Sequence, residues 1–395
     1  MQTVLGSGGQ IADELTRELH RNLTHDIRLV SRNPRKIHDT DQLFPADLMD
    51  AEATARAVEG SEIVYLTVGV PLPSELWERK FPTMMANTIA ACQKHGSKLV
   101  FFDNTYMYPR TATPQTEDTP FEPVGRKSIV RARIATMLLT EMAAGTIDAV
   151  ICRAPEFYGP DKTQSLSNTA VFDRIRQGKR PLVPLNAHAK RSLVWTPDAS
   201  RAMALIGNTP DAYGQTWHLP IDDQRLSYRQ MIDIASDATG RRIGYTSVPR
   251  WVFRIGGMLN LAVREAEELL PRYRQENIFR LLQVRHTIPR LRHHQLSRRN
   301  QPDRHRRTAG QPWPWLSPCL PAIARLAPPA MGSHVVRARI GFCLRRRYGP
   351  SHTLAACGCW LSRTNSSWRR RSATGCAWKR SQLTSRATAT LPWRC

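Results

Sequence analysis

Thr3-Val4-Leu5-Gly6-Ser7-Gly8-Gly9-Gln10-Ile11-Ala12, near the start of the chain, carries the clearest structural signal in the sequence. An apolar run ends in glycines, and apolar side chains then recur at helical spacing. This order predicts a strand, a tight turn and a helix. Glycine lets the backbone approach a pyrophosphate, whose charge is stabilised at the helix N-terminus. The stretch therefore predicts a dinucleotide-binding turn, and its candidate contacts are Gly6, Gly8, Gly9, Gln10 and Ile11.

The spacing of the glycines favours one form of this motif over another. A G-x-G-x-x-G motif that starts at Gly6 fails, because Ile11 takes its last position. The form G-x-x-G-x-x-G/A fits Gly6, Gly9 and Ala12. Turns between a strand and a helix also carry glycine for purely structural reasons, so the motif alone leaves both interpretations open.

The positive charge of the chain is concentrated after residue 280. The chain has 395 residues, enough for two or three domains, and its formal net charge of +24 by itself suggests an anionic partner. Residues 281–395, however, contain 22 of the 57 Lys and Arg but one of the 33 acidic residues, and so carry +21 of that charge. Residues 1–280 are close to neutral.

The tail after residue 280 also differs in its other residues. It holds six of the eight cysteines and six of the ten tryptophans, and its apolar residues keep no helical period. A basic arm that binds RNA or DNA is one interpretation, since arginine and tryptophan can bind phosphates and stack on bases. The near absence of lysine favours another, in which residues 281–395 come from a shifted reading frame and form no cooperative domain. We therefore do not expect a nucleic-acid partner.

The two cysteines before residue 281 and the hydropathy of the chain bear on the cellular compartment of the protein. Cys92 and Cys152 lie apart in apolar contexts, which is typical of reduced core residues in a cytoplasmic protein. The N-terminus lacks the pattern of a signal peptide. No apolar run reaches the roughly 18 to 20 residues that span a bilayer. We expect a cytoplasmic protein without a membrane partner.

The end of the second predicted strand, residues 26–31, bears on the choice of dinucleotide. An NAD site usually has Asp or Glu there to bond the ribose 2′-hydroxyl. Here Arg32 follows the strand and could hold a 2′-phosphate, which favours NADP over NAD, although a solvated basic loop has the same composition. The strand predicted at residues 62–68 includes Thr67 and is followed by Gly69, which lets a cofactor lie against the strand end.

Six segments occur in an order that is typical of one enzyme family: residues 6–12, 65–69, 101–109, 116–120, 153–160 and 196–199. On these segments, residues 1–279 resemble the extended or atypical short-chain dehydrogenase/reductases, the NAD-dependent epimerase/dehydratase family. The resemblance implies an α/β fold, a Rossmann-type doubly wound parallel sheet with a small C-terminal substrate domain. It assigns residues 1–160 to the NAD(P)-binding domain and residues 161–280 to substrate-domain elements with returning Rossmann segments. It also implies that Asp47 and Leu48 flank the adenine.

The usual catalytic motif of this family, Tyr-x-x-x-Lys on a helix, is missing from its expected place. The tyrosine exchanges a proton while a hydride passes to or from the nicotinamide, and the lysine lowers the tyrosine pKa. Around residues 124–133 the two positions fall on Ser128 and Ala132. Tyr158 and Lys162 match the spacing but follow a later strand, and the proline two residues after Tyr158 interrupts the helix that the motif needs.

Replacement catalytic residues are expected after the strand predicted at residues 98–102, because ligands of a doubly wound sheet lie beyond the carboxyl ends of its strands. The usual serine position falls on Asn104 or Thr105, and a nearby tyrosine could supply the proton. Packing against the loop is the alternative role for these tyrosines. The candidate catalytic residues are Asn104, Thr105, Tyr106, Tyr108 and, as the cation that lowers the tyrosine pKa, Lys127.

Three functions remain open from the sequence. The resemblance implies an NAD(P)-dependent epimerase, dehydratase or reductase for a small polar substrate such as a nucleotide-sugar, with Tyr158 and Arg153 in the substrate pocket. The missing motif favours a dinucleotide-binding redox sensor without catalysis, and nucleic-acid binding through the tail is the third. Histidines at metal-ligand spacing and a Gly-x-Ser-x-Gly motif are absent, so we expect neither a metal site nor a serine hydrolase. Homodimer formation stays open.

Overall fold

The computed structural model describes residues 1–273 except for 112, 161–164 and 222–224. All of them belong to one of the two units into which the chain divides, Met1–Ala327. The expectations for residues 281–395 therefore lie outside the described residues, as does Lys162.

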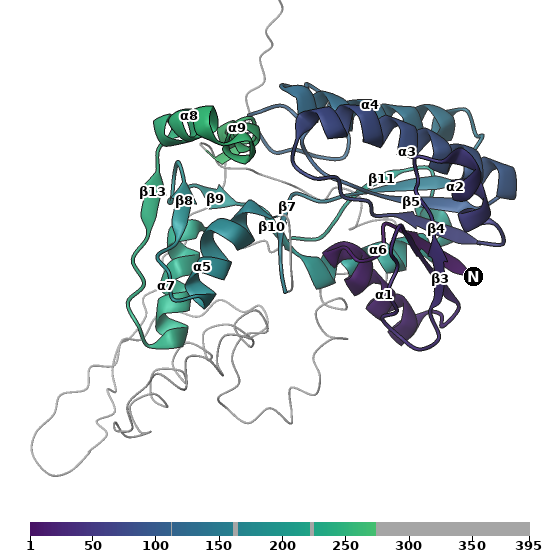
Figure 1. Ribbon diagram of the computed structural model, residues 1–395, viewed down its shortest axis with the longest axis horizontal. Helices are drawn as coiled ribbons and strands as arrows, with labels where there is room; N and C mark the ends of the chain where they lie inside the picture. The colour runs from purple at the N-terminus through teal and green to yellow at the C-terminus, as the bar shows by residue number, and fades with distance from the viewer. Residues whose placement is uncertain (112, 161–164, 222–224, 274–395) are drawn as a thin grey trace, which may run out of the picture. The chain divides into compact units, whose positions relative to one another are not determined.

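The described residues form a seven-stranded sheet in which every strand is parallel to its neighbours. The strands follow the spatial order β11-β6-β5-β4-β1-β2-β3 (Figure 1). In register, Val4 of β1 lies between Leu29 of β2 and Tyr65 of β4. The strand sequences are apolar runs without alternation, because a parallel strand that is covered on both faces buries all its side chains. The strands are β1 (Gln2–Leu5), β2 (Ile27–Ser31), β3 (Gln42–Pro45), β4 (Ile63–Leu66), β5 (Lys98–Asp103), β6 (Ala149–Arg153) and β11 (Thr216–His218).

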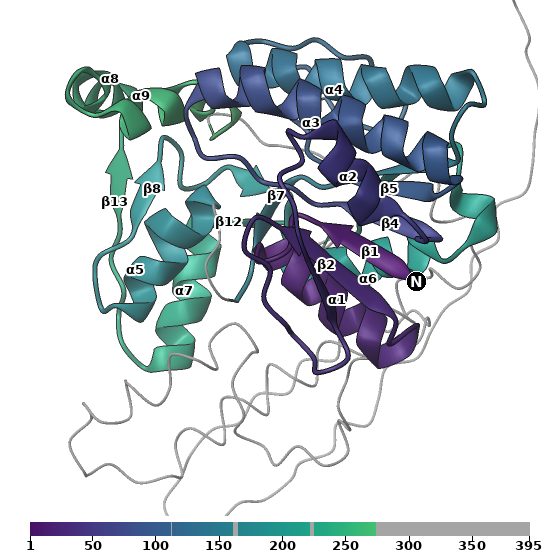
Figure 2. The ribbon, with the colours of Figure 1, turned by 45° about the vertical axis from the view of Figure 1, so that its right-hand side comes forward.

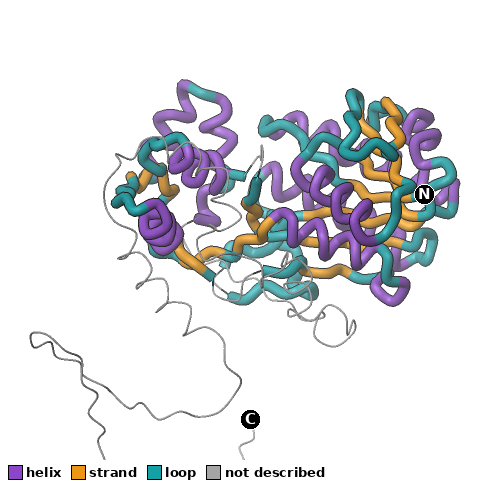
Figure 3. Tube along the Cα trace, turned by 90° about the horizontal axis from the view of Figure 1, so that it is seen from below, coloured by secondary structure: helices purple, strands orange, loops and turns teal. Residues whose placement is uncertain are grey.

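Helices cover both faces of this sheet (Figure 2). One core joins the sheet to α1 (Gln10–Asn22) and α6 (Thr196–Gly207). The other core joins it to α2 (Ala51–Val58), α3 (Ser74–His95) and α4 (Arg126–Ala143). Figure 3, with strands in orange and helices in purple, shows the sheet among these helices. The predicted doubly wound Rossmann-type sheet is confirmed.

Apolar side chains at helical spacing predict a helix over residues 81–95, but α3 begins seven residues earlier, at Ser74. Trp77 and Phe81 are both buried against the sheet, and their contacts stabilise the extra turns. Pro82 lies inside the helix, where a proline normally costs a backbone hydrogen bond. The earlier start places Ser74 in the first turn, which matters for the site described below.

Smaller elements surround a separate apolar cluster of Val171, Val183, Ala187, Tyr228 and Ile232. Three two-stranded sheets belong to this part of the chain, and two helices, α8 and α9, follow them among the described residues. The boundary of a substrate domain at residue 161 stays a prediction. The elements are β7 (Glu156–Tyr158), η1 (Asn168–Phe172), α5 (Asp173–Arg176), β8 (Leu182–Pro184), β9 (Lys190–Arg191), β10 (Leu193–Trp195), η2 (Pro210–Ala212), β12 (Leu226–Ser227), α7 (Tyr228–Thr239), β13 (Thr246–Val248), α8 (Arg250–Leu259), α9 (Leu261–Glu267) and η3 (Leu270–Tyr273).

Candidate functional site

The strand order reverses between β1 and β4. From β1 the chain passes through α1 to β2 on one side, whereas β4 and β5 continue the sheet on the other. Ligands of open α/β sheets bind outside the carboxyl ends of the strands at such a switch point. The glycine turn follows β1, and Thr67 and Gly69 follow β4, so both predicted segments lie at this point. Thr67 is buried there and donates its hydroxyl to Leu5 O at 3.0 Å.

The glycine turn has the geometry of a cradle for a phosphate. Gly6 (φ +97°) and Gly8 (φ +89°) adopt left-handed conformations that other residues rarely take. A Cβ at Gly6 would lie 2.9 Å from Val68 Cα, so the turn packs directly on the end of β4. A Cβ at Gly8 would meet no atom of the described residues within 4 Å, so that side of the turn is open. Gly9 then caps α1, whose first amides point out of the helix.

Buried polar atoms support a ligand at this turn. Gln10 donates its amide to the carbonyl of Pro160, while its Oε1 is buried without a hydrogen-bond partner among the described residues. Thr196 Oγ1, next to Gly159, is likewise buried and unpaired within that part of the chain. Such atoms are costly unless a ligand or water satisfies them. Thr196 begins one of the six segments typical of the family but is not among the predicted site residues.

The other predicted cofactor residues differ in how they could contact a dinucleotide. The Ile11 side chain is in the core, so its backbone alone faces the turn. Arg32 is exposed directly after β2, and Ser31 hydrogen-bonds Ser7 of the turn at 3.2 Å. Asp47 is exposed and accepts a hydrogen bond from the Met49 amide, whereas Leu48 is buried. Their roles toward ribose and adenine stay predictions.

A buried charge network follows β5. Asp103 Oδ1 accepts from Arg131 Nε of α4 at 3.0 Å, and Asp103 Oδ2 accepts from Arg153 Nε of β6 at 3.1 Å. All three side chains are at most 5% exposed. One carboxylate therefore compensates two guanidinium groups in a place shielded from water.

Tyr108 belongs to the same network. Its hydroxyl accepts from Arg153 Nη1 at 2.7 Å and lies 2.7 Å from His218 Nε2. Burial raises the pKa of Tyr108 to about 12, although Arg153 opposes the shift. The predicted substrate contact Arg153 is buried too, and its Nη2 has no hydrogen-bond partner among the described residues. Both side chains therefore hold the strand ends together from inside the protein.

The segment after Asp103 is a polar turn. Asn104 Oδ1 accepts from the Tyr106 amide at 2.9 Å, which fixes the backbone as an Asx turn. Thr105 is buried, and its carbonyl accepts from the Tyr108 amide at 3.2 Å. Tyr106 is half-buried, and its ring stacks over Trp77 of α3 at 6.2 Å with an 8° angle between the planes. The turn thus separates an inward tyrosine, Tyr108, from a partly accessible one.

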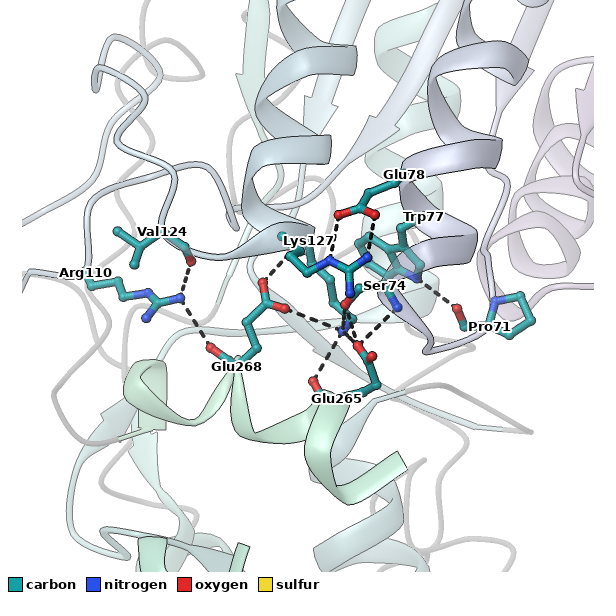
Figure 4. Close-up of polar contacts among 10 residues, drawn as sticks. Pro71, Ser74, Trp77, Glu78, Arg110, Val124, Lys127, Glu265 and Glu268 are labelled. Atoms are coloured by element: carbon teal, nitrogen blue, oxygen red, sulfur yellow. Dashed lines mark hydrogen bonds and ion pairs between the residues drawn. The ribbon is translucent and has the colours of Figure 1, made fainter. Parts of the chain in front are cut away.

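Lys127 is fully buried in the first turn of α4 (Figure 4). Its ammonium donates to Ser74 Oγ at 2.8 Å, pairs with the Glu265 carboxylate and lies 3.7 Å from Glu268 Oε2. Arg131, four residues on, is the neighbouring cation on the helix face toward the strand end. These acidic partners were missed because they follow Lys127 by more than 130 residues, and an effect of Lys127 on a tyrosine pKa stays a prediction.

The model of the NAD dependent epimerase/dehydratase family matches residues 3–219. The chain belongs to this family. The resemblance inferred from the six segments is thereby confirmed. One relative is the uncharacterized protein y4nL of Sinorhizobium fredii. It is 25% identical to this chain over 213 residues, which are 51% of this chain and 58% of that protein. The chain thus spans less than two thirds of this relative.

Solved structures of similar fold include family enzymes with bound NAD. A dTDP-glucose 4,6-dehydratase of Streptomyces venezuelae, DesIV, has a TM-score of 0.56 at 16% identity, over 63% of this chain and 84% of that one. UDP-glucuronic acid 4-epimerase of Bacillus cereus has a TM-score of 0.56 at 13% identity, over 63% and 87%. At this identity the likeness concerns the fold.

Tyr158 lies in a strand, whereas the Tyr-x-x-x-Lys motif of the epimerase/dehydratase family needs a helix. It ends the short strand β7, and its ring packs 5.2 Å from Trp195 and 5.6 Å from Phe172. Tyr158 is therefore part of a strand and not of the helix that the motif needs. Lys162 lies outside the described residues, and the rejection of Tyr158 and Lys162 as the catalytic pair stays a prediction.

The described residues also bear on metal binding and on membrane crossing. Within 1–273 and outside its gaps, no three His, Cys, Asp or Glu side chains gather in a way that could hold a metal ion. In the same part of the chain, no helix combines the length and apolar character needed to cross a bilayer. Cys92 and Cys152 are free and buried.

Proposed function

We propose that the protein is an NAD(P)-dependent epimerase, dehydratase or reductase that acts on a small polar substrate. The observation that carries this proposal is the open glycine turn at the switch point of the sheet, between the ends of β1 and β4. Nucleotide-sugars are the substrates to test first, since the similar solved enzymes are named for them.

The turn would hold the dinucleotide by its pyrophosphate. The first amides of α1 and the open side of Gly8 suit an anion at a helix N-terminus. Arg32, exposed after β2 and flanked in the sequence by Ser31 and Asn33, suits a 2′-phosphate and favours NADP over NAD. When bound, the nicotinamide accepts or donates the hydride, and the chain must then supply or remove a proton.

The proton donor is assigned to Tyr106. Tyr108 is fully buried with its hydroxyl between two partners, whereas Tyr106 is half-buried in the turn after β5. Asn104, in the same turn, suits a substrate hydroxyl or carbonyl. Loss of a general acid typically slows a reaction about 100- to 10,000-fold.

Single-turnover hydride transfer tests this assignment. Tyr106→Phe should slow the transfer by that factor, while Tyr108→Phe and Tyr158→Phe should stay within a few fold of the wild type. A full effect confined to Tyr158→Phe or Tyr108→Phe contradicts the assignment.

A second candidate is a dinucleotide-binding redox sensor without catalysis. The observation that favours it is the burial of Lys127, whose ammonium contacts Ser74 and acidic side chains. Tight NAD(P) binding with no turnover of any nucleotide-sugar or carbonyl compound would select this candidate. Nucleic-acid binding through residues 281–395 concerns a segment outside the described residues and gains no support from the site.

A further inference from the structure

Two long helices direct their N-termini at the carboxylates of Glu265 in α9 and of Glu268, the residue after α9. The Ser74 amide in the first turn of α3 donates to Glu265 Oε2 at 3.1 Å, and the Lys127 amide in the first turn of α4 donates to Glu268 Oε1 at 2.8 Å. The cap residues Pro73 and Gly125 make no side-chain cap within the described residues. The free amides and partial positive charge of two helices are therefore satisfied by side chains of a distant element.

A buried cation lies between the two helix ends. The Lys127 ammonium is fully buried, and its anionic partners in the described part of the chain are Glu265 and Glu268. The Ser74 hydroxyl bonds both the ammonium and the Glu265 carboxylate. Burial acts to raise the pKa of Glu265, but hydrogen bonds from Lys127 and Ser74 outweigh it and lower the pKa. A buried ammonium is costly without an anion, so an anion that replaces Glu265 and Glu268 at Lys127 favours release of α9.

Helix α9 is held mostly by these polar contacts. Among the residues of α8 and α9 whose burial is described, Gly257 alone is buried, so none of their side chains is. Trp251, Met258 and Leu259 are 62%, 81% and 88% exposed. Segments with little apolar burial open at low free-energy cost. Release of residues 250–267 would therefore uncover no buried side chain of this segment among those described, and the buried Leu270 lies beyond it.

The cluster adjoins the end of β5. Trp77, in the same first turn of α3 as Ser74, stacks on Tyr106. Arg131, one turn after Lys127, contacts Asp103 at the strand end. An anion bound to Ser74 and Lys127 would thus lie next to the turn that carries the candidate proton donor.

We propose that Ser74, Lys127 and the first amides of α3 and α4 form a binding site for a carboxylate or phosphate group of the substrate, and that α9 and the residue that follows it cover this site with Glu265 and Glu268. The anionic group displaces the two carboxylates, takes over the ammonium and the helix amides, and releases α9. That the anion belongs to a substrate rests on the proposed function. Anion binding and release of α9 do not depend on it.

Calorimetry with inorganic phosphate and with malonate on the full-length chain tests the site. Glu265→Gln/Glu268→Gln removes both competing charges and should raise the affinity for at least one probe by tenfold or more. Lys127→Met should abolish that binding, and Ser74→Ala, which keeps all charges, should weaken it several-fold. Preference for phosphate or for malonate tells which group the site takes.

Amide hydrogen exchange gives a second readout and separates the two proposals. The probe that binds should speed exchange in residues 250–267 of the wild type. Gly9→Val, aimed at the dinucleotide turn, should leave this binding unchanged even if it abolishes NAD(P) binding. The proposal is overturned if the double Gln variant gains no affinity, or if probe binding is lost in Gly9→Val and kept in Lys127→Met and Ser74→Ala.

Discussion

Asp103→Asn should destabilise the protein more than any ordinary polar substitution. The Asp103 carboxylate compensates Arg131 at 3.0 Å and Arg153 at 3.1 Å, and none of the three side chains is more than 5% exposed. Asparagine keeps the shape and one acceptor oxygen but removes the charge. Both guanidinium groups then stay buried without an anion, and breaking a buried pair typically costs about 3 to 5 kcal/mol.

Aromatic rings limit this loss. The Arg131 guanidinium lies 5.1 Å from the centre of Phe81, and that of Arg153 lies 5.0 Å from the centre of Tyr108. These cation–π contacts persist in the variant and are worth about 0.5 to 2 kcal/mol each. We therefore expect a net loss of about 3 kcal/mol in the free energy of unfolding, which leaves a measurable folded state in a domain of ordinary stability.

Urea unfolding of the full-length chain measures this loss. Asp233→Asn is the matched control, because Asp233 pairs with Arg229 at 3.0 Å on the surface of α7 with both side chains about half exposed. That substitution should leave the free energy of unfolding nearly unchanged, since solvated pairs contribute little. If Asp103→Asn costs less than about 1 kcal/mol, or no more than the control, the charges after β5 are not the buried network described here.

Three further predictions concern single groups. Because the pKa of Glu265 is lowered, its contact with Lys127 contributes fully above the ordinary carboxyl pKa and is lost as the pH falls through the lowered value. Without an added anion, the protection factors of the α9 amides, which correct for the intrinsic pH dependence of exchange, should therefore fall only in acid. Constant protection factors down to pH 3 would contradict this. Arg32→Ala should lower the ratio of NADP to NAD affinity about tenfold in calorimetry, and an unchanged ratio removes Arg32 from the site. Tyr108→Phe should cost about 1 to 3 kcal/mol of stability, because it leaves buried partners unpaired, and a neutral result in urea unfolding would place the hydroxyl in solvent.

The sheet and its glycine turn were accessible from the sequence because their signals are local. Apolar runs such as residues 98–102 mark strands that are buried on both faces, and the spacing of Gly6, Gly9 and Ala12 marks a turn. Both patterns depend on neighbours within a few positions. The order of six such segments then indicated the epimerase/dehydratase family.

The polar cluster could not be predicted in the same way. Lys127 and Glu265 are 138 positions apart, and a lone lysine at the start of a helix is usually a solvated surface residue. Ser74 lay before the predicted helix start, so its place beside Lys127 was hidden. The local indication of this polar cluster was the i, i+4 spacing of Lys127 and Arg131, because it puts two cations on one helix face.

Dinucleotide binding at the glycine turn is the central claim, and a fluorescence titration of NADH and NADPH against wild type and Gly9→Val tests it most directly. Gly9 has φ −97° and ψ 154°, which valine adopts readily, and a Cβ there lies 3.6 Å from Gly6 O, an ordinary contact. The variant should therefore fold as the wild type does while its side chain occupies the space that the pyrophosphate needs. The account predicts binding by the wild type and a loss of at least tenfold in affinity in folded Gly9→Val. Equal affinity of the two proteins, or no binding by the wild type, would contradict it.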